Sequence, residues 1–394
     1  MTAAKNPPAR SAPWLSLALR PFFLAAGIWA ALAIALWIGM LARGWAVPSR
    51  FTPLAWHVHE MLFGFVMAAV AGFLLTAIPN WTQRQPVHGA SLAALAALWL
   101  VGRIDTLLSS ALPLELAAGL ELAFPAALAL VVARELVAAR NRRNLPMIAP
   151  LLVLGCADLL MWLDPAGARG LQAYGWRLGL AAILILVSVI GARIVPNFTR
   201  NWLVQRGQAR LPAPHGLLDR VALAGLHLGL VGWVFFPTRA AVGVLLLAAA
   251  ALTFVRLARW RGLATFAEPL LFVLHLGYAW LAAGTALLGV ASLAPAFPLS
   301  AAIHALTAGT MGTMILAVMP RVARGHTGRA LTADRWTATA FALVNAAAAL
   351  RIAAALAAGW TWTLLVLSAT LWIAAFGVFA WRYAPILLRP AATR

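Results

Sequence analysis

The sequence has little charge. Only 10% of its 394 residues are charged, whereas 63% are hydrophobic. A soluble globular protein needs a charged surface, and no window of this chain is long and polar enough to provide one. The longest polar connections, 140–144 and 200–219, are the size of loops. The composition therefore predicts a polytopic membrane protein and excludes a soluble one.

Cysteine is almost absent, with the single Cys156 lying in an apolar segment. The chain therefore has no disulfide framework, no CxxC metal pair and no CxxCH haem-attachment motif. Any bound metal must be held mainly by histidine, carboxylate, methionine or backbone groups.

Acidic residues are also few: there are 10, against 30 Lys and Arg, giving a net charge of +20. In a soluble chain this charge would suggest nucleic acid, but here the basic residues cluster in alternate connections instead of gathering on one face. We expect no nucleic-acid partner.

Long apolar runs are abundant. A bilayer core of about 30 Å requires about 20 apolar residues per helix. By this rule we expect an all-α protein with twelve transmembrane helices, over 22–42, 54–78, 91–110, 114–138, 146–163, 171–195, 218–236, 240–258, 269–293, 299–319, 338–358 and 361–383.

The basic residues predict the orientation. With the N-terminus inside, all but seven of the 30 Lys and Arg fall on the cytoplasmic side, as the positive-inside rule requires. The exceptions are Arg43, Arg50, Arg103, Arg169, Arg177, Arg239 and Arg351. No convincing cleavage site precedes the first span, so we expect the residues before it to form a retained cytoplasmic tail. We therefore expect both termini on the cytoplasmic side of the membrane.

The second, sixth and tenth spans end in similar strings, at 76–82, 193–199 and 317–322, each with a proline. Proline cannot donate the next backbone hydrogen bond, so we expect these prolines to end their helices. An ordinary preference for proline at cytoplasmic ends is an alternative explanation. We predict a single transmembrane domain, 1–394, made of three four-helix repeats, roughly 20–140, 146–260 and 265–385.

The richest segment is 56–61, with the sequence Trp-His-Val-His-Glu-Met. Ionisable groups are costly inside a membrane, so such a cluster indicates a functional site. On an α-helix His57 and His59 point about 200° apart and would not chelate one metal, but they can serve sites on two sides. We expect His57 to share its face with Glu60. Either histidine alone could instead simply hydrogen-bond a neighbouring helix.

The tenth span starts similarly, because His304 follows Pro298 as His57 follows Pro53. Spans two and ten are therefore expected to present histidines at similar depth. Small residues after Pro298 leave room for close helix contact or for a flat macrocycle. They are Ala301, Ala305, Ala308, Gly309 and Gly312.

Other histidines are candidate ligands, since imidazole is the commonest metal ligand and binds many haems. His227 and His275 lie near the middle of spans, where each could equally be a satisfied polar group between helices. Tyr278 stands near His275 and could donate a hydrogen bond or a proton. His326 belongs to a basic loop string, 321–329.

Several charged residues lie within spans, among them Arg103, Asp105, Asp158 and Arg351. The arginines could pair with haem propionates and the carboxylates could relay protons. Ordinary ion pairs between helices explain them equally well.

Taken together, several of these strings resemble the NnrS family. They are 20–24, 56–61 with 72–82, 274–278, and His304 followed by 318–321 and 325–329. The resemblance covers nearly the whole chain and implies a bacterial membrane protein that contains haem and copper and is tied to nitric oxide, in denitrification or nitrosative stress. It makes His57, His59, His275, His304 and His326 candidate metal ligands, and to these we add His227.

The predicted arrangement also resembles subunit I of the haem-copper oxidases, which has twelve helices in three four-helix arcs. In that superfamily, helices two, six, seven and ten carry metal-binding histidines. The sixth span here departs from this pattern because it has no histidine, and no His-His pair follows the seventh span. Copper, if bound, is expected to use other ligands than in that superfamily.

The leading hypothesis is a protein that binds or reduces nitric oxide, with b-type haem, copper and an external electron donor. His57 or His59, together with His304, would hold the haem, with His275 near a second metal and with Arg103 and Arg351 as candidate partners of the haem propionates. Glu60, Tyr278 or Asp105 could help deliver protons. A twelve-helix transporter or permease, and a haem-binding sensor without turnover, remain alternatives, so enzymatic activity stays open.

Overall fold

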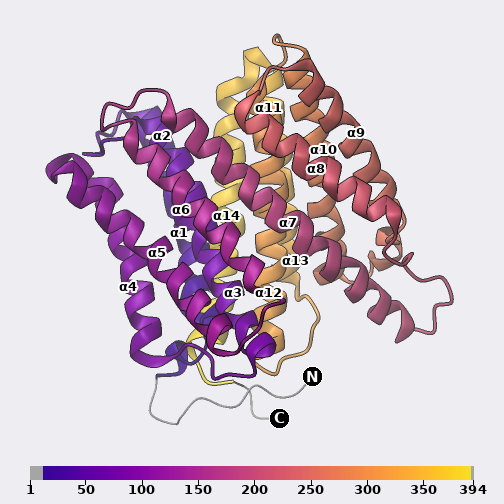
Figure 1. Ribbon diagram of the computed structural model, residues 1–394. Helices are drawn as coiled ribbons and strands as arrows, with labels where there is room; N and C mark the ends of the chain where they lie inside the picture. The colour runs from indigo at the N-terminus through magenta and orange to yellow at the C-terminus, as the bar shows by residue number, and fades with distance from the viewer. Residues whose placement is uncertain (1–11, 392–394) are drawn as a thin grey trace. The chain divides into compact units, whose positions relative to one another are not determined.

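The computed structural model describes residues 12–391, and within that range the chain is helical with no strand. Residues 1–11, which carry most of the predicted cytoplasmic tail, lie outside the described residues. The α-helices (Figure 1) are α1 Leu19–Arg43, α2 Pro53–His59, α3 Met67–Thr82, α4 Gly89–Leu108, α5 Leu114–Ala138, α6 Ile148–Leu163, α7 Leu171–Val204, α8 Leu217–Phe235, α9 Ala240–Ala258, α10 Pro269–Leu293, α11 Leu299–His304, α12 Thr313–His326, α13 Arg335–Leu356 and α14 Thr361–Leu388.

Twelve helical stretches of the described chain are long and apolar enough to cross a membrane. Each overlaps one of the twelve spans expected from hydropathy, which confirms the predicted number. Hydropathy finds them because every backbone polar group in a bilayer must be paired within its own helix. The twelve stretches support a multi-pass membrane protein.

The expectation that prolines end the second, sixth and tenth spans is wrong. Pro79, Pro196 and Pro320 all lie inside helices, and α7 continues as far as Val204. Proline removes only one backbone donor, and long membrane helices tolerate this where neighbouring groups pair the freed carbonyl.

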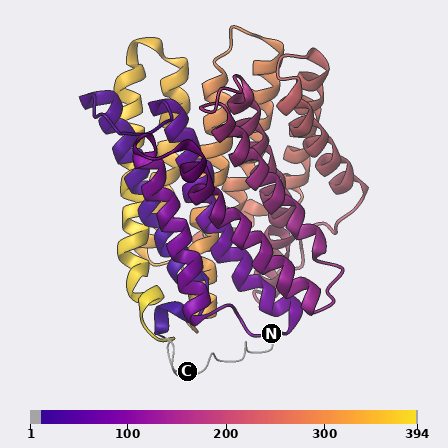
Figure 2. The same cartoon turned by 60° about the vertical axis from the view of Figure 1, so that its left-hand side comes forward.

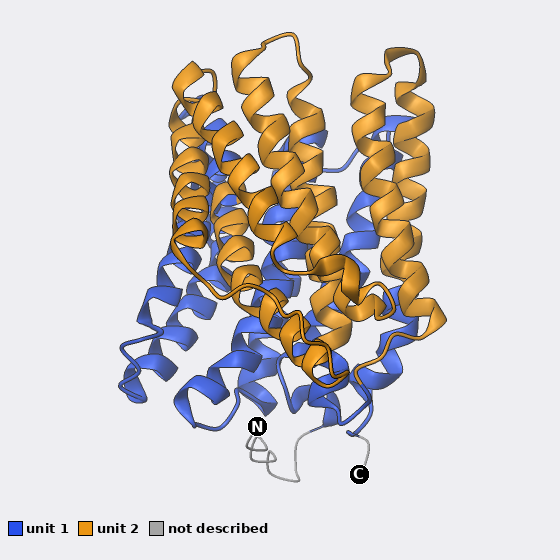
Figure 3. Cartoon of the chain, turned by 90° about the vertical axis from the view of Figure 1, so that its right-hand side faces the viewer, with its two compact units in different colours: residues 1–179, 322–330, 379–394 blue, residues 180–321, 331–378 orange. Residues whose placement is uncertain are grey.

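The chain divides into two compact units (Figure 3). Unit 1 comprises 1–179, 322–330 and 379–394, and unit 2 comprises 180–321 and 331–378. Within unit 1, α1 packs against α3, and α5 packs against both α4 and α6. Within unit 2, α9 packs between α8 and α10 (Figure 2).

Two spans change from α-helix to π-helix directly after a histidine. The segment η2, Glu60–Val66, follows His59, and η6, Ala305–Gly312, follows His304. Short π-helical turns are rare and frequently occur at functional sites. Both histidines therefore lie where the backbone departs from regular geometry, a parallel that the sequence did not reveal.

Candidate functional site

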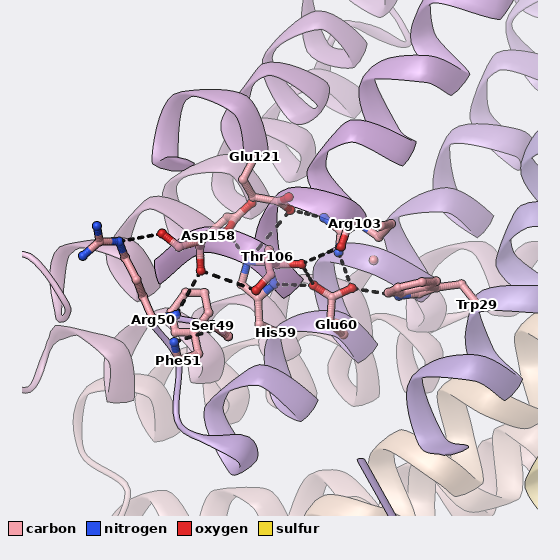
Figure 4. A network of polar contacts seen from close by, with 12 residues as sticks. Trp29, Ser49, Arg50, Phe51, His59, Glu60, Arg103, Thr106, Glu121 and Asp158 are labelled. Carbon is pink, nitrogen blue, oxygen red and sulfur yellow. Dashed lines mark hydrogen bonds and ion pairs between the residues drawn. The ribbon is translucent and has the colours of Figure 1, made fainter. Parts of the chain in front are cut away.

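Five ionisable side chains meet in the interior of unit 1, each from a different helical element (Figure 4). His59 ends α2 and Glu60 begins η2, while Arg103, Glu121 and Asp158 come from α4, α5 and α6. Each of the five is at most 2% exposed to solvent. We call these five residues the buried cluster.

Glu60 is held by four hydrogen-bonding groups. Its Oε2 accepts from Trp29 Nε1 at 2.8 Å and from Arg103 Nη1 at 2.7 Å. Its Oε1 lies 2.7 Å from the Thr106 hydroxyl and 3.2 Å from His59 Nδ1. A carboxylate with this many donors is fixed in one orientation.

Arg103 links two of the carboxylates. One terminal nitrogen donates to Glu60, and the other donates to Oε1 of Glu121. The planar guanidinium group suits this role because its donors diverge in a fixed fork. Glu60 and Glu121 are thus held on either side of a single cation.

His59 directs both ring nitrogens at carboxylates. Nδ1 faces Glu60, while Nε2 lies 2.9 Å from Asp158 Oδ1 and 3.9 Å from Glu121 Oε1. The ring stacks on Phe51 with centroids 5.0 Å apart, which sets its plane. The imidazole therefore joins Asp158 and Glu121 to the pair formed by Glu60 and Arg103.

Two glycines make room for the cluster. A Cβ atom at Gly102 would lie 2.3 Å from Glu121 Oε2, and one at Gly64 would lie 2.6 Å from Arg103 Nη1. Gly64 also accepts a 3.0 Å hydrogen bond from the indole of Trp99 at its carbonyl within η2. Any larger residue at 64 or 102 would push the charged groups apart.

Not every oxygen of this region is paired. Glu121 Oε2 and Asp158 Oδ2 are buried with no hydrogen-bond partner among the described residues. The same holds for both oxygens of Asp105, two positions after Arg103 on α4. Unpaired buried polar atoms are uncommon in proteins and indicate a missing ligand, ion or water.

His57 lies against a different partner. Its ring stacks on Trp37 of α1, with centroids 4.1 Å apart and planes inclined by 19°. As expected, His57 and His59 face different surroundings. Glu60 contacts α1 through Trp29, as His57 does through Trp37, and it also reaches Arg103 and His59.

In unit 2, His275 is hydrogen-bonded to Thr199 of α7. Its Nε2 lies 2.8 Å from the Thr199 oxygen, whose own hydrogen is donated to the Val195 carbonyl at 2.9 Å. Thr199 must therefore accept from Nε2–H, which leaves the lone pair of the neutral ring on Nδ1. That atom is buried without a partner among the described residues, beside the backbone of Gly262.

His227 and Tyr278 both contact Ser188 of α7. His227 Nε2 lies 2.8 Å from the Ser188 hydroxyl oxygen, and Tyr278 donates to the Ser188 carbonyl at 3.2 Å. Arg256 donates to the Tyr278 oxygen at 2.8 Å and to Asp219 Oδ1 at 2.7 Å. Tyr278 does not bond His275; the two rings instead lie on Trp260.

His304 is oriented by its own helix. Its Nδ1 lies 2.7 Å from the carbonyl oxygen of Ser300, one turn earlier, and Arg351 donates to the Ser300 hydroxyl at 3.0 Å. The small residues that follow allow close contact with aromatic rings: a Cβ at Gly309 would lie 2.8 Å from the Trp280 ring. At Gly309 the small residue therefore allows close helix packing, which is the first of the two roles expected for the small residues of this span.

His326 is not in a loop as expected, because α12 continues through the basic string and ends at this residue. Its Nδ1 lies 3.0 Å from the Val322 carbonyl, the same geometry as at His304. His88 precedes α4 and His215 precedes α8, so both lie in connections between helices.

A family model described as NnrS protein matches residues 13–391, nearly the whole chain. The chain belongs to the NnrS family. A comparison with curated proteins found no match. The buried cluster of this NnrS-family protein consists of residues that all lie within the matched region.

The sequence interpretation missed Glu121 entirely and did not connect Asp158 with His59. Both are carboxylates within apolar spans, so the rule that drew attention to residues 56–61 would have selected Glu121 too. Ser188, Thr199 and Ser300 gave no signal, because single hydroxyl residues are common in membrane helices.

The cluster supports two kinds of chemistry. Carboxylates linked to one imidazole can hold and pass protons, and three of its members can hold a metal ion. One ligand atom each from His59, Glu121 and Asp158 lie within 4.8 Å of one another.

Proposed function

We propose that this protein is a haem- and copper-containing protein of the bacterial cytoplasmic membrane that binds or reduces nitric oxide. Membership of the NnrS family supports the proposal, since the resemblance implies haem, copper and nitric oxide. The twelve helices are consistent with it, because buried histidines between membrane helices can hold a haem.

The observation that carries the proposal is the hydrogen bond of His304. Metal-bound histidines almost always donate their second ring nitrogen to a carbonyl or carboxylate, which fixes the ring and the tautomer. The contact of Nδ1 with the Ser300 carbonyl does this and puts the lone pair on Nε2. His304 would therefore be able to hold haem iron through Nε2.

Arg351 fits the same haem through its charge. Its Nη2 donates to Ser300, which places the guanidinium beside His304, and its Nε is buried without a partner among the described residues. A haem propionate would pair with such a group. Arg103 fits this role less well, because two protein carboxylates already accept from it.

Copper fits His275. The unpaired Nδ1 lone pair is the kind of nitrogen that binds copper, and Thr199 holds the ring in the required tautomer. His57, His227 and His326 remain further candidates.

Haem and copper, when bound, would bind nitric oxide and pass it electrons from an external donor. This chain would supply protons from Tyr278 in unit 2 and from Glu60 in unit 1. Glu60 is joined to His59 and Thr106 by hydrogen bonds, along which a proton could move.

We also propose that spans two and ten are equivalent members of three four-helix repeats, arranged as in haem-copper oxidase subunit I, with both termini cytoplasmic. The supporting parallel is local: each span has a proline at its start, a histidine ending a short α-helix, a π-helical segment and then a second proline.

The test is optical and resonance spectroscopy with metal analysis on the purified full-length protein, oxidised, reduced and exposed to nitric oxide. We expect haem bands that shift with nitric oxide, and loss or change of these bands in His304→Ala. The control His215→Ala, at an exposed residue, should leave them unchanged.

A colourless, metal-free protein after expression with ample haem and copper would overturn the proposal and favour a transporter. Bound haem without turnover of nitric oxide would favour the sensor instead.

A further inference from the structure

The buried cluster has an excess of negative charge. Even with Arg103 and His59 both counted as positive, only two cations face the three carboxylates of Glu60, Glu121 and Asp158. All are almost fully buried, where an uncompensated charge is costly. At least one further positive charge, a metal ion or a shared proton, is needed at this place.

The hydrogen bonds show where that charge belongs. The contact of His59 Nδ1 with Glu60 is the carboxylate–histidine arrangement that orients metal-bound imidazoles. It directs Nε2 at Asp158 Oδ1 and Glu121 Oε1, 2.9 and 3.9 Å away. When His59 is neutral and donates Nδ1–H to Glu60, its Nε2 lone pair faces these two carboxylates, which is repulsive unless a metal ion or a proton lies between them.

The spacing also fits one ion. With metal–ligand bonds of about 2.0–2.2 Å, ligand atoms around a tetrahedral or octahedral ion lie about 3.0–3.4 Å apart. The separations of 2.9 and 3.9 Å from Nε2 bracket that value. Small movements of the Glu121 side chain would close the longer one.

A second observation points to a ligand at the same place. Glu121 Oε2 and Asp158 Oδ2 are buried and unpaired, on side chains at most 2% exposed that point toward His59 (Figure 4). Gly102 leaves the space that Glu121 Oε2 occupies. The Glu121 carboxylate is therefore held close to α4, and hydrogen bonding within the cluster satisfies neither Glu121 Oε2 nor Asp158 Oδ2.

We propose that His59, Glu121 and Asp158 bind a divalent cation of the Mn²⁺, Fe²⁺ or Zn²⁺ kind, separate from haem and copper. One imidazole with two carboxylates is a donor set for such ions, whereas Cu(I) selects sulfur ligands. Glu60 orients His59, and Arg103 orients Glu121, so both act as positioning residues. The proposal does not depend on His304 or His275.

The test uses the purified full-length protein, treated with a chelator and then titrated with Mn²⁺, whose paramagnetic resonance signal reports the free ion. We expect one high-affinity site per chain. Glu121→Gln and Asp158→Asn keep the side-chain volume but remove one negative ligand, and each should weaken binding at least tenfold. Glu115→Gln, at an exposed position of the same helix α5, should leave the affinity unchanged.

A measurement on the unaltered protein covers the case in which a variant fails to fold. Mn²⁺ or Zn²⁺ should raise its thermal unfolding temperature above the value in chelator, because a ligand that binds only the folded state stabilises it.

Three results would overturn the proposal: no Mn²⁺ or Zn²⁺ site in the wild type, equal weakening in Glu115→Gln, or an unchanged affinity in both cluster variants. In the first case the extra positive charge would be a proton shared between the carboxylates. Haem content is a separate readout, so a protein that binds Mn²⁺ but lacks haem would count only against the proposed function.

Discussion

His59 Nε2 lies 2.9 Å from Asp158 Oδ1, although the two residues are 99 positions apart in the sequence. The contact joins α2 to α6 across the interior of unit 1. The segment 56–61 is therefore part of a site built from several helices, because His59 and Glu60 contact charged residues of α4, α5 and α6.

Replacing Arg103 should be strongly destabilising. Arg103→Met leaves Glu60 and Glu121 buried without their shared cation, and breaking a buried pair costs about 3–5 kcal/mol. Arg134→Met is the control: its ion pair with Glu135 is at the surface, with 65% of the arginine side chain exposed, and should change stability by at most about 1 kcal/mol. Unfolding of both variants in detergent micelles measures the difference, and equal effects would mean that the buried pairs are not formed.

Alanine substitutions of two glycines on neighbouring helices should change the stability of the protein in opposite directions. In Gly102→Ala the new methyl group would lie 2.3 Å from Glu121 Oε2, and such overpacking costs about 1–3 kcal/mol. In Gly119→Ala, on α5, the methyl group meets no atom within 4 Å, so the better helix propensity of alanine should be neutral or stabilising by up to about 1 kcal/mol. Thermal unfolding compares the two. A Gly102→Ala protein as stable as Gly119→Ala would show that Glu121 does not approach α4.

Tyr278→Phe should reduce stability without changing the shape of the core. It removes the oxygen that accepts from Arg256 and donates to the Ser188 carbonyl, and unpaired buried groups cost about 1–3 kcal/mol. Tyr174→Phe, at a residue 39% exposed, should have little effect. If Tyr278 delivers protons to nitric oxide, turnover in Tyr278→Phe will fall even at temperatures where the variant is fully folded. Unchanged turnover there would exclude that role.

Thr199→Val tests the copper ligand assigned to His275. Valine keeps the shape of threonine but cannot hold the His275 ring, and loss of such a hydrogen bond typically lowers metal affinity about 10–100-fold. Thr253→Val is matched, because its buried hydroxyl bonds only the carbonyl of Ala249 in its own helix. Copper content and the copper resonance spectrum should change in the first variant alone. The same copper content in both would remove His275 from the proposal.

The number and approximate limits of the twelve spans could be predicted because each is encoded locally, in about 20 apolar residues. The histidines could be selected for a similar reason, because a polar residue within an apolar run can be recognised from the sequence alone. The partners of His59 could not, since Glu121 and Asp158 approach it only through the packing of α5 and α6. The tautomer of His275 likewise depends on Thr199, 76 positions away.

The π-helical segments were also hidden from sequence patterns. Periodicity analysis assumes one regular helix over a whole span, so it placed Glu60 with His57. The helix changes at the boundary between α2 and η2, and Glu60 there contacts Arg103 and His59 in addition to Trp29 of α1.

The π-helical segment η2 also makes the length of the second span critical. A π-helical turn holds more residues than an α-helical turn, so η2 offsets the faces of α2 and α3 relative to an uninterrupted helix. Deleting one residue from η2 would rotate everything after it by about 100°. Residues of α3 that now face the protein interior would then turn toward lipid, while His59 stayed in place. The second span should therefore tolerate single substitutions more readily than the deletion of a single residue.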